Sequence, residues 1–224
     1  MKKEITKRLL SSLIIAPIAL FFIIKGSVFF IFFLGIIFLV TIYEWLNMSK
    51  KLKILKIFGI FFLFLSFILA YLLRKTQGFD LFIFVILISI LTDIGGYIFG
   101  KIFKGPKLTK ISPNKTYSGV IGSFLVSLIG SLIYLEFLPG VLFWSYFGGY
   151  EQAGIGYNFF TLLIILIISL ISQLGDLIIS FFKRLAKIKD TGNILPGHGG
   201  LLDRIDGIIF AVPFSYIFLN FIVY

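Results

Sequence analysis

The chain has 224 residues, of which 59% are apolar and 18% aromatic, and its formal net charge is +11. A soluble domain of this length would be far less hydrophobic, so the composition predicts an all-α integral membrane protein with one membrane domain over residues 1–224. The absence of cysteine excludes disulfides and thiolate metal sites. In a membrane protein the basic balance indicates loop topology and attraction to anionic lipid, and we expect no nucleic acid as a partner.

Seven apolar stretches predict seven membrane-spanning helices. The basic start at residues 1–8 and the apolar run after it resemble a signal peptide, but no small-residue cleavage site follows, which favours a retained first span. The segment 138–158 has aromatic residues and no Lys or Arg, so we expect it at the far interface, with a re-entrant segment at 140–150 as the alternative. The predicted spans are 9–24, 27–43, 54–73, 79–100, 120–137, 159–182 and 205–223.

Basic residues divide unevenly between the two sides of this topology. The connecting segments on one side hold 18 of the 21 Lys and Arg, and Lys25, Arg74 and Lys75 remain for the other side. The positive-inside rule then predicts a cell-membrane protein with a cytoplasmic N-terminus and a C-terminus outside. The cytoplasmic segments would be 1–8, 44–56, 101–118 and 183–204.

Charged residues, glycines and the only histidine gather in residues 180–206. Ionisable groups beside hydrocarbon are costly and usually mark a functional site. Asp203 and Asp206 are three positions apart, so on a helix both carboxylates would face one way and could share a hard cation such as Mg²⁺. The alternative is a plain loop whose lysines set topology, but topology does not explain paired aspartates.

Groups suited to phosphate accompany these carboxylates. Three glycines at 197, 199 and 200 let the backbone approach an anion closely or adopt a positive φ, although a simple turn would also use them. Three basic side chains can neutralise phosphate oxygens. They are Lys183, Arg184 and Arg204.

The sixth predicted span carries a polar face. Gln173, Asp176 and Ser180 are spaced i, i+3, i+7, which places them on one side of the helix. Burial of Asp176 must be offset by a metal ion, a cation or water, so we expect it at a metal or phosphate site. A salt bridge to a neighbouring lysine is the alternative.

The spacing in this stretch resembles the signature of the phosphatidate cytidylyltransferases, the CDP-diacylglycerol synthases. The matching residues are Ser180, Lys183-Arg184, Lys189-Asp190, Pro196-Gly197-His198-Gly199-Gly200 and Asp203-Arg204-Ile205-Asp206. The resemblance implies transfer of CMP from CTP to phosphatidic acid, with release of pyrophosphate, in membrane phospholipid biosynthesis. It also implies Mg²⁺ on Asp176 and Asp203, with Asp206 as a further candidate, a second cation such as K⁺, and a homodimer.

A second block, at the end of the fourth span and after it, resembles another family motif. Asp93-Ile94-Gly95-Gly96-Tyr97 is similar to the family's acid-x-Gly-Ala-Tyr, and residues 112–119 are similar to its Ser-Pro-Lys-Lys-Thr-Trp-Glu-Gly. Here Asn114, Tyr117 and Ser118 replace the lysine, the tryptophan and the glutamate. The resemblance implies nucleotide or lipid-phosphate contacts, with a solvated loop as the alternative. The residues concerned are Asp93, Tyr97, Ser112, Lys115 and Thr116.

The implied reaction assigns roles to the remaining residues. The phosphate of the lipid would attack the α-phosphorus of CTP in line, and it needs no general base because it is already anionic. His198 would therefore position the loop or contact phosphate, with a structural hydrogen bond as the alternative. Catalytic roles fall to Asp176, Asp203, Lys183, Arg184 and Arg204, and substrate contacts to Ser180, Lys189, Asp190, Gly197, His198, Gly199 and Gly200.

Two other functions are compatible with these residues. A related CTP-dependent membrane enzyme could act on a lipid alcohol, although an alcohol nucleophile requires a base. A transporter could bind a coupling ion at Asp93 and Asp176, but we find no internal repeat, and the polar residues lie toward one membrane face. We therefore expect a cytidylyltransferase whose active site faces the cytoplasm.

Overall fold

A computed structural model describes residues 2–50, 52–109, 111–113, 115–137, 159–195, 197 and 199–222. Within these ranges the regular structure is helical, and the β-structure consists of two isolated bridges, between Lys107 and Thr116 and between Leu195 and Gly199. The segment 138–158 and its alternative re-entrant part lie outside the described residues. The helices are α1 (Lys2–Lys25), α2 (Ser27–Met48), α3 (Lys53–Thr76), α4 (Gly78–Phe103), α5 (Tyr117–Phe137), α7 (Phe159–Leu185), α8 (Leu202–Ile205) and α9 (Ile208–Ile222).

Five of the described helices, α2, α3, α4, α5 and α7, are long and apolar enough to cross a membrane. The first and last of the seven predicted spans correspond to shorter apolar helices, Ile15–Lys25 within α1 and Ile208–Phe221 within α9. At 1.5 Å per residue, α9 with its 15 residues is about 22 Å long, less than the roughly 30 Å of a hydrocarbon core. The architecture therefore has the helices of a polytopic membrane protein, with five spans supported by length and composition.

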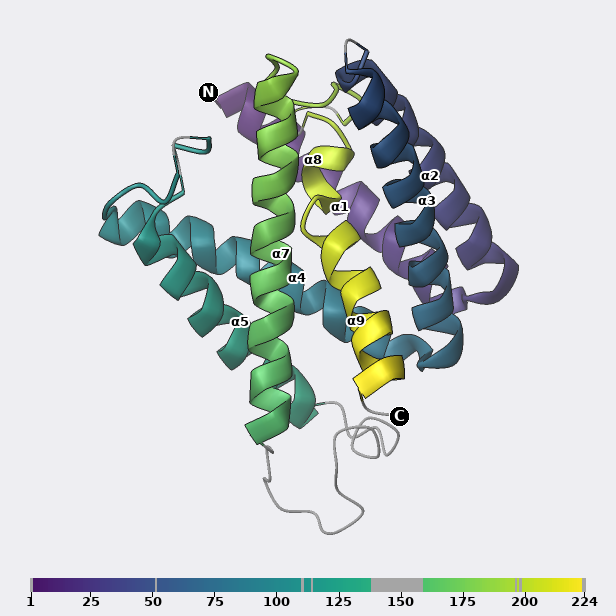
Figure 1. The fold of residues 1–224 in the computed structure, drawn as a ribbon. Helices are drawn as coiled ribbons and strands as arrows, with labels where there is room; N and C mark the ends of the chain where they lie inside the picture. Colours follow the sequence, from purple (N-terminus) through teal and green to yellow (C-terminus); the bar gives the residue numbers. More distant parts are fainter. Residues whose placement is uncertain are drawn as a thin grey trace.

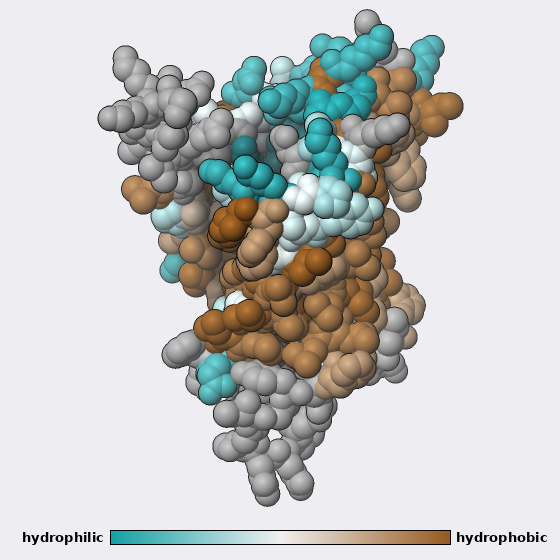
Figure 2. Space-filling view, turned by 90° about the vertical axis from the view of Figure 1, so that its left-hand side faces the viewer, coloured by the Kyte–Doolittle hydropathy of each residue, from teal (hydrophilic) through white to brown (hydrophobic). Residues whose placement is uncertain are grey.

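The polar ends of several helices meet at one end of the bundle. In Figure 1 the end of α2, the start of α3, the end of α7 and the single turn α8 lie toward the top. Helix α4 slants across the bundle, at a large angle to α7. The space-filling view shows hydrophilic side chains gathered at this end above a hydrophobic band (Figure 2). A charged site and an apolar, membrane-compatible body are thus separated along the bundle axis.

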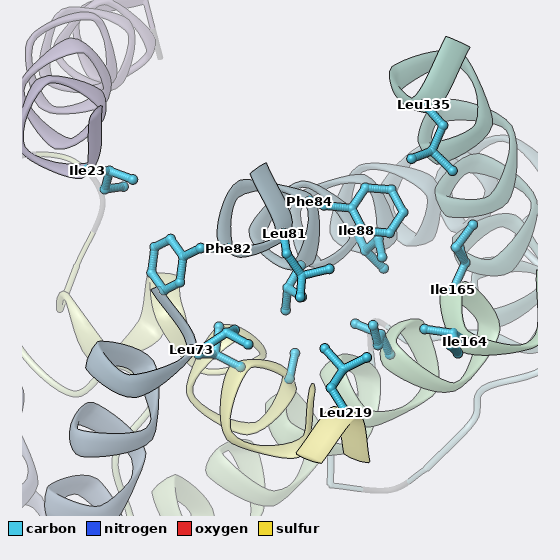
Figure 3. Close-up of a cluster of buried hydrophobic side chains, with 14 of the residues drawn as sticks. Ile23, Leu73, Leu81, Phe82, Phe84, Ile88, Leu135, Ile164, Ile165 and Leu219 are labelled. Atoms are coloured by element: carbon cyan, nitrogen blue, oxygen red, sulfur yellow. The ribbon is translucent and has the colours of Figure 1, made fainter. Parts of the chain in front are cut away.

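The main core is hydrocarbon contributed by α3, α4, α7 and α9. Ile88 of α4, Ile165 of α7 and Leu73 of α3 are fully buried members of this one cluster (Figure 3). A smaller cluster nearer the polar end surrounds Trp45 of α2 and includes residues of α3, α7 and α8. The second cluster matters for function because it packs the end of α2 against Leu202 of α8, within the charged stretch 180–206.

Glycines explain how closely α4 and α5 approach. A Cβ on Gly95 would meet the carbonyl oxygen of Gly122, and a Cβ on Gly119 would lie 2.9 Å from the carbonyl oxygen of Gly96. Small residues at such positions let two helix backbones come into contact in a membrane protein. The glycines that interrupt the fourth span therefore serve helix packing.

A second close approach joins α7 to the turn before α9. A Cβ on Gly175 would lie 2.9 Å from the carbonyl oxygen of Asp206, and one on Gly207 would meet the hydroxyl of Ser172. Glycine at both positions lets the two segments touch. Because Asp176 follows Gly175 in α7, this contact places Asp176 near the turn that contains Asp206.

Candidate functional site

Asp176 is the point where α7 meets the segment between α4 and α5. Its Oδ1 accepts a hydrogen bond of 3.3 Å from Ser180, one turn further along α7, and its Oδ2 forms a 2.5 Å ion pair with Lys115. The side chains of Asp176 and Lys115 are each about a quarter exposed, at 26% and 25%. The structure thus brings together three predicted site residues, through the salt bridge that was the alternative interpretation of Asp176.

Asp206 and Asp93 extend this charged group. Asp206 is 7% exposed in the turn between α8 and α9, where the amide of Gly207 donates to it. Burial raises the pKa of Asp206 well above its usual value, and the negative charges of Asp176 and Asp93 raise it further, against the charge of Lys183. Three predicted carboxylates from α4, α7 and this turn therefore act on one another electrostatically.

Asp203 has a different set of partners. Its Oδ1 lies 2.8 Å from Lys183, and its Oδ2 accepts hydrogen bonds from the amides of Thr191, at 2.8 Å, and Gly200, at 3.1 Å. The Lys183 and Asp203 side chains are only 11% and 8% exposed. Asp203 therefore organises the polar loop before α8, whereas Asp206 belongs with Asp176 and Asp93.

No group of three or more His, Asp or Glu side chains that could hold a metal ion occurs among the described residues. The expectation that Asp203 and Asp206 share one cation does not follow from this geometry, because their carboxylates take different partners. A magnesium site on Asp176 with Asp203 or Asp206 stays a prediction.

We call residues 191–202 the glycine loop, and its described residues turn tightly and lead into α8. The amide of Leu195 donates to the carbonyl oxygen of Gly199, and Gly197 and Gly199 have φ values of 78° and 86°, a region in which glycine is favoured. Gly200 has another reason to be glycine, since a Cβ there would meet the hydroxyl of Thr191. His198 lies outside the described residues.

The predicted basic residues divide by role. Arg184 donates to the carbonyl oxygens of Ile111 and Ile188, at 3.3 and 3.1 Å, and so links the segment after α4 to the end of α7. Arg204 is exposed on α8, and its charge reaches Asp93. Lys189 and Asp190 are exposed just before the glycine loop. Lys115 and Lys183 each contact a site carboxylate directly.

The segment before α5 folds back on itself. The amide of Leu108 donates to the carbonyl oxygen of Lys115, and the amide of Ser112 donates to the hydroxyl of Thr109. The hydroxyl of Thr116 accepts a hydrogen bond of 3.1 Å from the amide of Gly119, which caps the start of α5. A helix cap is thus the role the structure gives Thr116, and its phosphate contact stays a prediction.

Tyr97 lies apart from these contacts. Its side chain is 67% exposed, its hydroxyl is 3.4 Å from the ammonium of Lys101, and that ammonium lies 5.5 Å from its ring centre. The structure does not bring Tyr97 against Asp176 or Asp203.

Glu44 of α2 is a site residue that sequence analysis missed. It is 1% exposed, and its carboxylate accepts hydrogen bonds from the hydroxyl of Thr191 and the amides of Leu201 and Leu202. The sequence predicts that the second span ends at residue 43 and that a cytoplasmic segment, 44–56, follows it, whereas α2 continues to Met48. An acid four residues before Met48 at a span end was the one signal available.

Fold and site together define a helical membrane protein whose charged residues gather at one end of an apolar bundle, and such residues usually mark a functional site. A family model described as the cytidylyltransferase family matches residues 52–222. The chain belongs to this family, which confirms the resemblance found in its motifs.

Similar curated proteins carry a more specific name. The chain is 40% identical over 147 residues to "Phosphatidate cytidylyltransferase" of Staphylococcus saprophyticus, and 42% identical over 147 residues to the protein of that name from Staphylococcus aureus strain COL. A third, from Staphylococcus epidermidis, is 39% identical. Each match covers 65% of this chain and 51% of the relative, so the chain spans about half the length of the curated relatives it matches.

Proposed function

We propose that this protein transfers CMP from CTP to phosphatidic acid, giving CDP-diacylglycerol and pyrophosphate. Membership of the cytidylyltransferase family and the name of its relatives support this reaction. The observation that carries it is the meeting of Asp176 with Lys115, which joins the family's two motif blocks at the polar end of an apolar bundle.

The residues of the chain suit phosphoryl chemistry by position and charge. Lys115 can exchange Asp176 for a phosphate oxygen, since an ammonium binds either anion. Arg204 is exposed, its charge acts on Asp93, and its guanidinium can neutralise a second phosphate. In such a reaction the protein contributes mainly positioning and electrostatic stabilisation.

Magnesium fits this donor set. Mg²⁺ is usually held by one or two carboxylates together with substrate phosphates, so a site with fewer than three protein ligands is suitable. Asp176 and Asp206 are the carboxylates we assign to it, because the contact of Gly175 with the Asp206 turn brings the two residues near each other, and a cation would offset the buried charge of Asp206. When bound, the ion would neutralise charge on the reacting phosphates. A second cation such as K⁺ would bind near the same carboxylates.

The protein's setting forms part of the proposal. The site end of the bundle is the basic end, so it would face the cytoplasm of the cell membrane, with the N-terminus inside. Phosphatidic acid would reach Asp176 from the bilayer and CTP from the aqueous side. We also propose a homodimer, as the family resemblance implies.

The test is CTP-dependent conversion of phosphatidic acid to CDP-diacylglycerol by purified protein in detergent with and without Mg²⁺. We expect conversion by the wild type and a loss of at least about 100-fold in Asp176→Asn, because the neutral amide loses the ion pair with Lys115 and holds a hard cation much more weakly than a carboxylate does. Asp203→Asn should lose activity similarly, since Lys183 would lose its charge partner.

Asp80→Asn is the matched control, because Asp80 lies in the first turn of α4, at its other end. It should retain activity within about twofold. Consumption of CTP with a lipid alcohol and none with phosphatidic acid would replace the proposal with a lipid kinase. No turnover with either acceptor, together with ion binding, would favour a transporter.

A further inference from the structure

Glu44 occupies an unusual place for a carboxylate. It is 1% exposed, in the last two turns of α2, and its carboxylate accepts three hydrogen bonds from the glycine loop. The hydroxyl of Thr191 lies 3.1 Å from Oε2, the amide of Leu202 lies 2.8 Å from Oε2, and the amide of Leu201 lies 2.9 Å from Oε1. An ionised carboxylate only accepts hydrogen bonds, so it matches three donors without conflict.

Two glycines of the loop lie directly against this carboxylate. A Cβ on Gly192 would lie 2.7 Å from Oε1, and a Cβ on Gly200 would lie 2.8 Å from Oε2. Both distances are too short for a real side chain, so glycine at each position lets the loop reach Glu44. Gly192 and Gly200 stand near the two ends of the loop, and Glu44 therefore joins those ends.

The same strip of loop holds Asp203 from its other side. The amides of Thr191 and Gly200 both donate to Oδ2 of Asp203, whose Oδ1 pairs with Lys183. Thr191 thus donates to Glu44 through its hydroxyl and to Asp203 through its amide. Displacing the loop from Glu44 would displace the donors that orient Asp203.

Packing fixes Glu44 as firmly as its hydrogen bonds do. The next residue, Trp45, is 2% exposed, packs over Gly59 of α3 and makes an edge-on contact with Phe182 of α7, with ring centres 5.6 Å apart. The carboxylate is therefore presented by a rigid helix, which is how precise sites are supported.

We propose that Glu44 is a positioning residue for the transfer reaction, a buried carboxylate that ties both ends of the glycine loop and so keeps Asp203 and Lys183 in working geometry. The inference rests on the proposed function. Glu44 lies before residue 52, where the family match begins, so α2 contributes to the site from outside the matched segment.

The test compares Glu44→Gln, Glu44→Asp and Thr41→Val. Thr41 is also buried in α2, but its hydroxyl donates to the carbonyl oxygen of Ile37 in its own helix, so it controls for loss of a buried polar group. We expect kcat to fall at least tenfold in Glu44→Gln with KM for CTP changed less than threefold, because one amide N–H₂ would face loop donors. Glu44→Asp should recover part of the rate, and Thr41→Val should stay within twofold of wild type.

Hydrogen exchange of peptides from the glycine loop is the second readout, and it does not depend on activity. Glu44→Gln should speed amide exchange at Thr191 and Leu202 at least fivefold, while Thr41→Val leaves it unchanged. Unchanged exchange and a rate within twofold of wild type in Glu44→Gln would overturn the proposal.

The two proposals fail separately. A wild type without CMP transfer would end the proposed function, and loop exchange would still decide whether Glu44 holds the loop. If Glu44→Gln fails to fold, Thr191→Val replaces it, since that change removes one donor and keeps the loop backbone. Equal losses of activity and of thermal stability in Glu44→Asp and Thr41→Val would show a merely structural role.

Discussion

At the scale of single residues, the carboxylates of the site differ in how easily they can be released. Asp203 is held by a nearly buried lysine and two backbone amides, so removing its partners would cost several hydrogen bonds at once. Asp176 is held by Ser180 and by Lys115, and both members of that ion pair are a quarter exposed. Any cation that binds Asp176 therefore competes with the Lys115 ammonium for one carboxylate oxygen.

Thr116 provides a residue-scale prediction, because loss of a helix cap lowers stability, whereas loss of a phosphate contact raises KM for CTP. Thr116→Ala should lower stability by about 1 kcal/mol, the usual value of a helix cap, and lower the melting temperature in detergent. Thr116→Ser should restore it, since serine caps equally well. KM for CTP should stay within twofold; a tenfold rise at unchanged melting temperature would favour the nucleotide contact.

Sequence reasoning reached several of these residues and missed others for identifiable reasons. Asp176, Ser180 and Lys183 were found because helical spacing and costly charge mark them in any apolar chain. The pairing of Asp176 with Lys115 was open, because spacing says nothing about residues on different helices. Glu44 was missed because an acid at a span end looks like surface until its donors, about 150 positions later, are placed.

At the scale of helices, small residues decide which elements touch. Gly95 and Gly96 stood out in the sequence as part of a family-like motif, but their partners in α5 did not, since a glycine gives no sign in sequence of what approaches it. The structure pairs Gly95 with Gly122 and Gly96 with Gly119. The packing of α4 on α5 thereby fixes Asp93, which lies within α4, and Thr116, which lies immediately before α5. The segment that carries Lys115 connects these two helices.

Gly122→Ala tests this packing. Its Cβ would meet the side chain of Phe99, so we expect a loss of about 1–3 kcal/mol, as for other overpacked sites, and a lower melting temperature. Gly35→Ala is the matched control in α2, because no atom lies within 4 Å of its Cβ position. That change should be neutral or stabilise by up to about 1 kcal/mol through helix propensity. Equal effects of both substitutions would contradict the packing role.

At the scale of the whole molecule, hydropathy predicted the helical class and the order of the long spans, but not where helices end. α2 continues through Glu44 to Met48, and α4 extends to Phe103, because polar residues at helix ends still find partners in loops. The seventh span was predicted to begin at residue 205, but α9 begins at Ile208, because a turn at Asp206 and Gly207 separates it from α8. The apolar run therefore did not give the length of the helix.

Orientation in the membrane is the prediction at this scale. Lys53→Cys and Lys107→Cys, at the basic end, should be protected from an impermeant thiol reagent in intact cells and labelled after lysis. Lys75→Cys, at the other end, should be labelled without lysis. The background is clean because the chain has no cysteine. The reverse labelling pattern would invert the proposed topology.

The long sequence separation between Glu44 and its donors has a consequence for synthesis. Thr191 follows Glu44 by 147 residues, and Leu202 follows it by 158. At translation rates of about 5–20 residues per second, the donors emerge roughly 7–30 s after the carboxylate. During that interval α2 must wait in the membrane with its acid uncovered, and its place near the helix end keeps the acid close to water. Closure of the loop on Glu44 is thus one of the last events in the biogenesis of this site.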